Sequence, residues 1–187
     1  KVAASNETLL WTGVAGANAY DGIVTLLNAA GLPAAQDITS VASTAANVID
    51  EMGKVIDAIP TTVYGKEDLK LYVSSNIARN YVRALGGFAA AGLGANGTEN
   101  KGTQWYTNGS LSFDGIPVFV ANGLADNSMV AACVSNLYFG TSLLSDWQEA
   151  SVIPVHLYDG SDNVRIVMRM QVGAQIGIAD DCVVYSA

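Results

Sequence analysis

The residues with the most obvious chemical potential are one histidine and two cysteines. His156 is the only histidine, so a serine or cysteine triad would have to use it. It alternates with apolar neighbours in a predicted strand, and neither a Gly-x-Ser-x-Gly elbow nor an activated thiol accompanies it. We interpret His156 as a surface or interface residue. Cys133 and Cys182 lack the close Cys or His companions of a zinc site, so we expect two buried thiols in a reducing compartment.

The carboxylates and glycines form no catalytic or nucleotide-binding pattern. Asp50-Glu51 and Asp180-Asp181 are adjacent pairs, and adjacent side chains point in different directions on a helix or a strand. The run Gly92-Leu93-Gly94 lacks the Gly-Lys-Ser/Thr ending of a phosphate-binding loop. The sequence therefore predicts no catalytic residue, no cofactor-binding residue, no metal site and no enzyme activity.

Composition restricts the class of protein and its partners. The 187 residues are 50% hydrophobic and 14% charged, which is typical of one folded unit whose surface is partly covered by neighbouring subunits. No apolar run approaches the roughly 18 residues of a bilayer span, so we expect no membrane partner. The net charge of −8 argues against sequence-specific nucleic-acid binding, which relies on clustered Lys and Arg. Because the chain begins with Lys and shows no signal-peptide pattern, we expect a processed product or an excised fragment.

Two helical segments are predicted before residue 32. One ends around Glu7 to Trp11, where Gly13 and Gly16 offer the left-handed conformations that end helices. The other lies within Asp21 to Ala30 and stops at Gly31-Leu32-Pro33.

The clearest helix runs from about Ala45 to Ile59, with Ser43 or Thr44 as its cap. Its apolar residues form one stripe, and its charged residues point elsewhere. The stripe comprises Val48, Ile49, Met52, Val55, Ile56 and Ile59, and the charged residues are Asp50, Glu51, Lys54 and Asp57.

A strand and another helix follow this one. Residues Leu69 to Val73 alternate in a way that predicts a strand with one buried face, Lys70 and Tyr72 lying on the other. Ser74 or Ser75 can cap the helix that comes next. Its core-facing stripe comprises Ile77, Tyr81, Val82 and Leu85, and its solvent-facing side carries Arg79, Asn80 and Arg83.

From Gly86 to Gly109 the sequence predicts a long irregular loop, and loops of that length are usually functional. Trp105 and Tyr106 within it are either an interface anchor or residues that hold the loop against its own domain. We select as candidate subunit-interface residues Gly92, Asn96, Trp105, Tyr106 and Asn108.

The last third of the chain reads as strands bounded by turn residues. We expect strands at Ile116 to Ala121, Met129 to Ser135, Val152 to Tyr158, Val164 to Val172 and Cys182 to Tyr185. The third and fourth make a long hairpin across Asp159-Gly160-Ser161-Asp162, with one face of the fourth formed by Val164, Ile166, Met168, Met170 and Val172. Helices inserted among strands, followed by strands alone, indicate an α+β fold.

The order of the elements in the second half carries a family resemblance. The first segments are Gly115-Ile116-Pro117-Val118 and a small-residue stretch from Asn122 to Asn127. A strand from Ala131 to Tyr138 then leads to a helical turn at Gly140 to Trp147. The hairpin with its Arg-bearing second strand follows, and Asp181-Cys182-Val183-Val184 is the closing segment. In this order the segments resemble the closing part of tailed-phage major capsid proteins of the Hong Kong 97 type. Upstream, Glu7 to Trp11 resembles the end of that family's spine helix. The family's N-terminal arm, extended loop and most of its spine helix are absent.

The resemblance implies a fold, an organisation and a function. It implies an axial domain at residues 32–147 and 180–187, with a mixed sheet flanked by helices, and a remnant of the peripheral domain at residues 1–31 and 148–179, with a long β-hairpin. It further implies a structural subunit that forms hexamers and pentamers of an icosahedral capsid around a phage genome, with scaffold and portal proteins as further partners. Such a shell assembles in the host cytoplasm and resides in the virion. The loop from Gly92 to Gly109 would lie toward the centre of each capsomer.

Two other functions stay open at this point. A bacterial encapsulin, whose nanocompartment shell has the same fold, would enclose an enzyme cargo in place of a genome. A small hydrolase or ligand-binding domain would need a polar pocket under Trp105 and His156, and the sequence offers no second polar partner for it.

Overall fold

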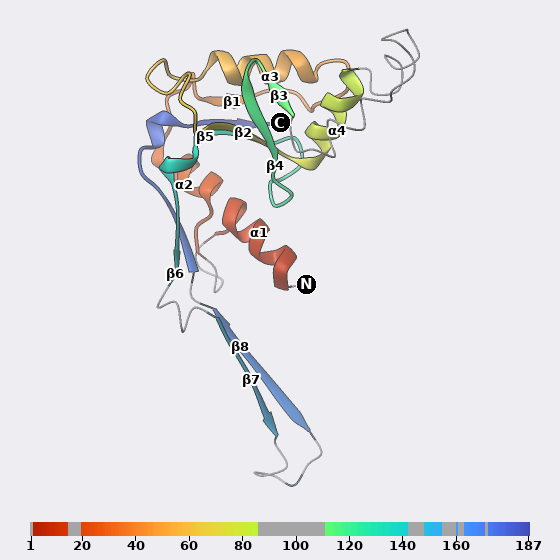
Figure 1. Cartoon of the computed structure of the whole chain (residues 1–187), viewed down its shortest axis with the longest axis vertical. Helices are drawn as coiled ribbons and strands as arrows, with labels where there is room; N and C mark the ends of the chain where they lie inside the picture. Colours follow the sequence, from red (N-terminus) through yellow and green to blue (C-terminus); the bar gives the residue numbers. More distant parts are fainter. Residues whose placement is uncertain are drawn as a thin grey trace.

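The computed structural model describes residues 2–14, 20–85, 111–141, 148–154, 160, 163–170 and 172–187. Its centre is a six-stranded sheet in the order β1-β10-β5-β2-β4-β3 (Figure 1). Two neighbouring pairs, β1 with β10 and β2 with β4, are parallel, and the other three are antiparallel. The mixed sheet and its helices confirm the predicted α+β class. The strands are β1 Asp37–Thr39, β2 Leu69–Val73, β3 Ser112–Phe113, β4 Ile116–Val120, β5 Met129–Cys133 and β10 Val183–Ser186.

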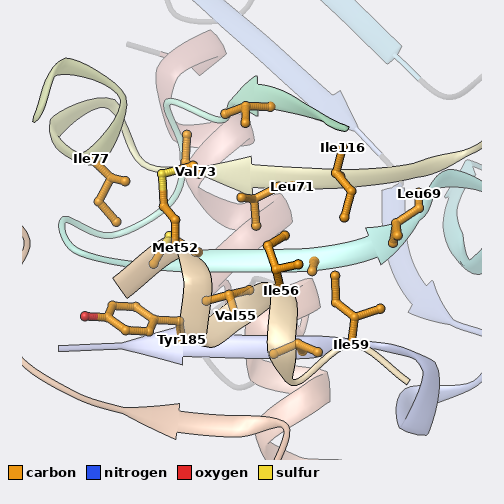
Figure 2. Packing of buried hydrophobic residues seen from close by; sticks show 14 of the residues in the cluster. Met52, Val55, Ile56, Ile59, Leu69, Leu71, Val73, Ile77, Ile116 and Tyr185 are labelled. Carbon is orange, nitrogen blue, oxygen red and sulfur yellow. The ribbon is translucent and has the colours of Figure 1, made fainter. Parts of the chain in front are cut away.

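Helices α3 (Val48–Asp57) and α4 (Ser75–Ala84) cover one face of this sheet. Their apolar stripes pack against strand residues of the same face, as Figure 2 shows for Met52, Val55 and Ile77. Full burial of one such aliphatic side chain contributes about 1.5–3 kcal/mol relative to leaving it in water. The sheet and these two helices therefore form the main core, which includes Val48, Met52, Val55, Leu69, Leu71, Val73, Ile77, Met129, Val183 and Tyr185.

Helices α1 (Val2–Thr12) and α2 (Ile23–Ala30) contribute to a second core on the opposite face. Trp11 lies against Tyr72 there, with ring centroids 5.1 Å apart. Tyr72 is buried, so β2 has both faces covered, and the prediction of one buried face was wrong. Strands buried on both sides lose the simple alternation that reveals a half-exposed strand. The second core also contains Leu27, Val130, Ala132, Cys182 and Val184.

The predicted helix around residues 45–59 exists but begins later than expected. Its N-cap is Asn47, whose Oδ1 accepts a hydrogen bond from the Thr44 backbone N–H at 2.6 Å, so neither Ser43 nor Thr44 caps the helix with its side chain. The predicted stripe is buried except for Ile49, which is 44% exposed. Glu51, expected on the outer side, is buried instead because it bonds to Lys54 and Tyr185.

Helix α4 begins after its N-cap Ser74, as predicted, although the Ser74 side chain bonds to Asn76 and not to the helix backbone. Ile77 and Tyr81 are buried, but Leu85 lies at the C-cap and is 38% exposed, so its place in the core-facing stripe was wrong.

Helix α1 ends at Thr12, beside the predicted stop, but for a different physical reason. Gly13 has no positive φ. It is needed because a Cβ there would collide with the carbonyl oxygen of Tyr20, and a Cβ on Gly22 would meet main-chain atoms of Trp11 and Gly13 at 2.6 Å. Gly31 does adopt the left-handed conformation that ends α2, with φ of 70°.

The remaining strands form two separate antiparallel pairs. Strands β6 (Leu137–Thr141) and β9 (Val172–Ile176) pair with each other, as do β7 (Gln148–Pro154) and β8 (Val164–Met170). The long hairpin is confirmed, but its first strand begins four residues before Val152, and Val172 belongs to β9. Gly140 and Thr141, expected in a helical turn, are in β6, while residues 142–147 lie outside the described residues.

Short elements complete the described chain. Single 3-10 turns span Val134–Asn136 and Ala179–Asp181. Asp114 and Gly115 join β3 to β4 with positive φ at both positions, the geometry of a tight hairpin turn. None of the helices in the described ranges combines the length and the apolar character of a membrane span.

Candidate assembly surface

The hairpin of β7 and β8 extends away from the rest of the protein (Figure 1). Within the described part of the chain, its two strands pair with each other alone and form a two-stranded sheet. A two-stranded hairpin is marginally stable in water, because it has too little apolar surface to bury. This element therefore depends on contacts beyond its own strands.

The register of the hairpin places apolar residues together on one face. Val152 is opposite Ile166 and Pro154 is opposite Val164, and directly opposed residues in an antiparallel pair share a face. Ala150 lies two positions before Val152 and so has the same orientation. We call these five residues the apolar hairpin face: Ala150, Val152, Pro154, Val164 and Ile166.

This face is open to solvent. Val152 is 66% exposed, and Val164 and Ile166 are each 62% exposed. Its members include no charged residue, whereas the opposite face is mixed, with Ser151 and Arg165 beside Ile153 and Val167. Contiguous exposed apolar surface is uncommon on monomers and is typical of a surface that another protein covers.

The hairpin joins the body of the protein with a break in register. Thr141 of β6 pairs with Val172 of β9, and Gln148 of β7 pairs with Met170 of β8. Residues 142–147, six in number, separate the pairs on one strand, whereas residue 171 alone separates them on the other. The β6–β9 pairing and the β7–β8 pairing are therefore consecutive along the chain, but their registers differ.

Aromatic residues are also exposed on the body. Tyr138 and Phe139 on β6 and Phe119 on β4 are all more than half exposed. Phe119 contacts the edge of the Tyr72 ring, with centroids 5.7 Å apart, on the sheet face that α1 covers. Large exposed aromatic side chains commonly anchor interfaces between proteins.

Glu51 is the buried carboxylate of the described core, and its partners hold it in place. Lys54 Nζ lies 2.8 Å from Glu51 Oε1, and the Tyr185 hydroxyl donates to Glu51 Oε2 at 3.0 Å. Burial raises the pKa of Glu51, but the hydrogen bonds from Lys54, Ser40 and Tyr185, together with the Lys54 charge, outweigh it and lower the pKa overall. Glu51 is thus an ionised carboxylate held inside the fold, with its oxygens occupied by partners.

The cysteines are both free and buried, which confirms the prediction for their burial. Burial raises the pKa of Cys182 to about 11 and also raises that of Cys133. Such thiols are poor nucleophiles at neutral pH. Within the described ranges, no group of three His, Cys, Asp or Glu side chains could hold a metal ion.

The interface residues selected from the sequence lie outside the described residues. They are Gly92, Asn96, Trp105, Tyr106 and Asn108. His156, interpreted from the sequence as a surface or interface residue, lies outside the described residues as well. The apolar hairpin face was not among the selected residues. The sequence did contain a signal for it. Apolar residues alternate along both strands, which predicts an apolar face, and no other predicted segment is available to cover that face.

Comparison with solved structures identifies the fold. The chain matches the capsid of a native GTA particle with a TM-score of 0.63 at 14% identity, covering 98% of this chain and 61% of that one. It matches the holo-SrpI encapsulin complex from Synechococcus elongatus PCC 7942 with a TM-score of 0.60 at 9% identity, covering 99% and 61%. A chain from Mycobacterium phage Che8 matches with a TM-score of 0.58 at 14% identity, covering 81% and 54%.

The chain has the Hong Kong 97-type capsid fold. It spans little more than half to about three fifths of the length of these solved chains. No protein family model matches the sequence, and no curated protein matches it either. The likeness is therefore one of three-dimensional structure, at sequence identities of 9% to 14%.

Proposed function

We propose that this protein is a structural subunit of an icosahedral viral capsid, in which hexamers and pentamers enclose a phage genome. The observation that carries the proposal is the apolar hairpin face, displayed by a chain whose fold is that of shell-forming proteins. An exposed apolar face costs free energy in an isolated chain and stabilises an assembly that covers it. The protein acts as a building unit and not as an enzyme.

The proposal also assigns partners, place and domains. The main partner is the protein itself, with scaffold and portal proteins as further partners, in a shell that assembles in the host cytoplasm and remains in the virion. The net charge of −8 suits an inner wall along which packaged DNA must slide without binding. Residues 32–147 and 180–187 would form the axial domain, and residues 1–31 and 148–179 would remain from the peripheral domain.

An encapsulin-type shell is the second candidate function. The SrpI encapsulin structure covers 99% of this chain, as completely as the capsid structures do. The two functions differ in content, because a capsid encloses nucleic acid and an encapsulin encloses protein cargo. Mass spectrometry and nucleic-acid analysis of particles purified from their natural source separate them.

The test of shell formation compares two neighbouring residues of β7. The full-length protein, expressed alone and with its scaffold, should form closed shells in negative-stain electron microscopy. Val152→Asp places a charge on the apolar hairpin face and should abolish shells, leaving soluble folded subunits. Ser151→Asp makes the same change on the opposite face of the same strand and should leave more shells than Val152→Asp does. A wild-type protein that stays monomeric in every condition contradicts the proposal.

A further inference from the structure

Helices α3 and α4 lie over opposite halves of the same sheet face. Helix α3 is joined to the β1–β10 side, because Glu51 accepts a hydrogen bond from Tyr185 of β10 and Lys54 donates to Ser40 after β1. Helix α4 is joined to the other side, because the Tyr81 hydroxyl donates to the Ser112 carbonyl oxygen of β3 at 2.7 Å. The two helices are therefore joined to different sides of the sheet, α3 to the side of β1 and β10 and α4 to the side of β3.

The exposed stripe of α3 is acidic. Asp50, Lys54 and Asp57 recur at intervals of four and three residues and are all exposed, so they lie along one side of the helix. Lys54 is engaged with Glu51 at 2.8 Å, which cancels its charge locally. Asp50 and Asp57 have no ion-pair partner among the described residues. Two uncompensated negative charges thus face solvent from α3.

The exposed stripe of α4 is basic. Arg79 and Arg83 are four residues apart and exposed, and Arg79 bonds only to Ser75 of its own helix. Neither arginine forms an ion pair within the described part of the chain, although α3 and α4 contact each other. Two uncompensated positive charges therefore face solvent from α4.

Each charged stripe has an exposed apolar neighbour. Ile49, beside Asp50, is 44% exposed, and Leu85, beyond Arg83, is 38% exposed. Apolar residues next to charges of opposite sign on two surfaces are the composition of a specific protein interface. The α3 stripe and the α4 stripe complement each other in charge and in apolar content.

We propose that the α3 stripe of one copy docks on the α4 stripe of the next copy, so that Asp50 and Asp57 meet Arg79 and Arg83. The occupant of each stripe is a second copy of this chain, because the complementary surface is on the chain itself and its charges form no ion pair among the described residues. Since the two stripes are different surfaces of one chain, the contact is head-to-tail, and its repetition forms a ring where the rotation between copies closes. This inference rests on the proposed function and specifies the contact that holds a capsomer together.

Charge reversal tests the contact in the full-length protein. The acidic-stripe variant is Asp50→Arg with Asp57→Arg, and the basic-stripe variant is Arg79→Glu with Arg83→Glu. Each variant places like charges at the contact and should yield at least about tenfold less assembled material than wild type at low salt. The chain with all four reversals restores opposite charges and should assemble again.

Mixing the two variants provides a sharper readout. The acidic-stripe variant then carries positive charge on both stripes, and the basic-stripe variant carries negative charge on both. Alternating copies satisfy every contact in a six-membered ring, whereas a five-membered ring cannot alternate. The mixture should therefore recover hexamers by native mass spectrometry while closed shells, which need pentamers, stay rare.

A matched control changes net charge elsewhere. Glu7→Arg with Asp180→Arg alters the net charge as much as the acidic-stripe variant does, at two exposed residues that belong to neither helix. Glu7 is on α1, which packs on the opposite face of the sheet. This control variant should keep assembly near the wild-type level. Circular dichroism verifies folding, and if a reversal prevents folding, the neutral pairs Asp50→Asn with Asp57→Asn and Arg79→Gln with Arg83→Gln replace it.

The outcomes separate this contact from the function on which it rests. Failure of the wild-type protein to assemble contradicts the proposed function. Assembly of wild type and of both reversed variants in equal yield contradicts the helix contact alone. Equal loss in the Glu7 and Asp180 control would also overturn it, because net charge would then explain the result.

Discussion

The hydroxyl of Tyr185 donates to Glu51 Oε2 at 3.0 Å and also lies 2.7 Å from the carbonyl oxygen of Val41. One side chain on β10 therefore joins α3 to the segment that leads into it. Tyr185 is fully buried beside the apolar side chains of α3, as Figure 2 shows. This contact helps to hold β10 in its place between β1 and β5.

Replacing Tyr185 with Phe should destabilise the protein by about 1–3 kcal/mol, because the buried Glu51 carboxylate loses the hydroxyl as a hydrogen-bond partner. The measurement is urea-induced unfolding followed by circular dichroism, repeated at several protein concentrations. Tyr64→Phe is the control, since Tyr64 is 51% exposed and should change stability by less than about 0.5 kcal/mol. Equal stability of the Tyr185→Phe variant and wild type would contradict the role given to this hydroxyl.

The lowered pKa of Glu51 predicts how stability depends on pH. Its folded pKa lies below the ordinary value of 4.5, so the unfolded chain binds the proton more readily. Its contribution to stability is therefore fully present above pH 4.5 and is lost as the pH falls through the folded pKa. The stability difference between wild type and Glu51→Gln should shrink as the pH is lowered from 6 to 3. Urea unfolding across that range measures it, and a difference that stays constant would show that Glu51 is not the titrating group.

The sequence predicts the helices and strands that have one buried face and one solvent-exposed face. The stripe of α3 and the strand β4 follow from periodicity alone, because each has one face in the core and one in water. Tyr72 and Glu51 do not follow, since their burial depends on Trp11 and Tyr185, which are far away in the sequence. Long-range partners of this kind leave no local pattern.

The apolar hairpin face was also predictable in part from the sequence. The alternation of apolar residues in β8 is visible in the sequence, and the hairpin was predicted from it. That the resulting face stays uncovered is a property of the tertiary arrangement, because the hairpin lies beyond the layers that bury the other strands (Figure 1). The break in register between β6–β9 and β7–β8 likewise needs the pairing itself.

The two thiols should react only after unfolding. Burial raises the pKa of Cys182 to about 11 and raises that of Cys133, so little thiolate exists near pH 8 and reagents lack access. An Ellman titration at pH 8 should find almost no reactive thiol in the native protein and two per chain in denaturant. Single Cys133→Ala and Cys182→Ala variants assign any residual signal. Rapid reaction of either thiol in the native protein would contradict its burial.

A pair of glycine substitutions tests how α1 is held. A Cβ on Gly123 would collide with the main chain of Glu7, so this loop approaches the helix backbone closely. Gly123→Ala should destabilise the protein by about 1–3 kcal/mol, because backbone must move to admit the methyl group. Gly53→Ala is the matched control. A Cβ there meets nothing within 4 Å, and the change should stabilise α3 by about 0.5–1 kcal/mol through its higher helix propensity. Opposite shifts of the melting temperature support the close packing of α1 on the sheet, whereas equal shifts of the same sign contradict it.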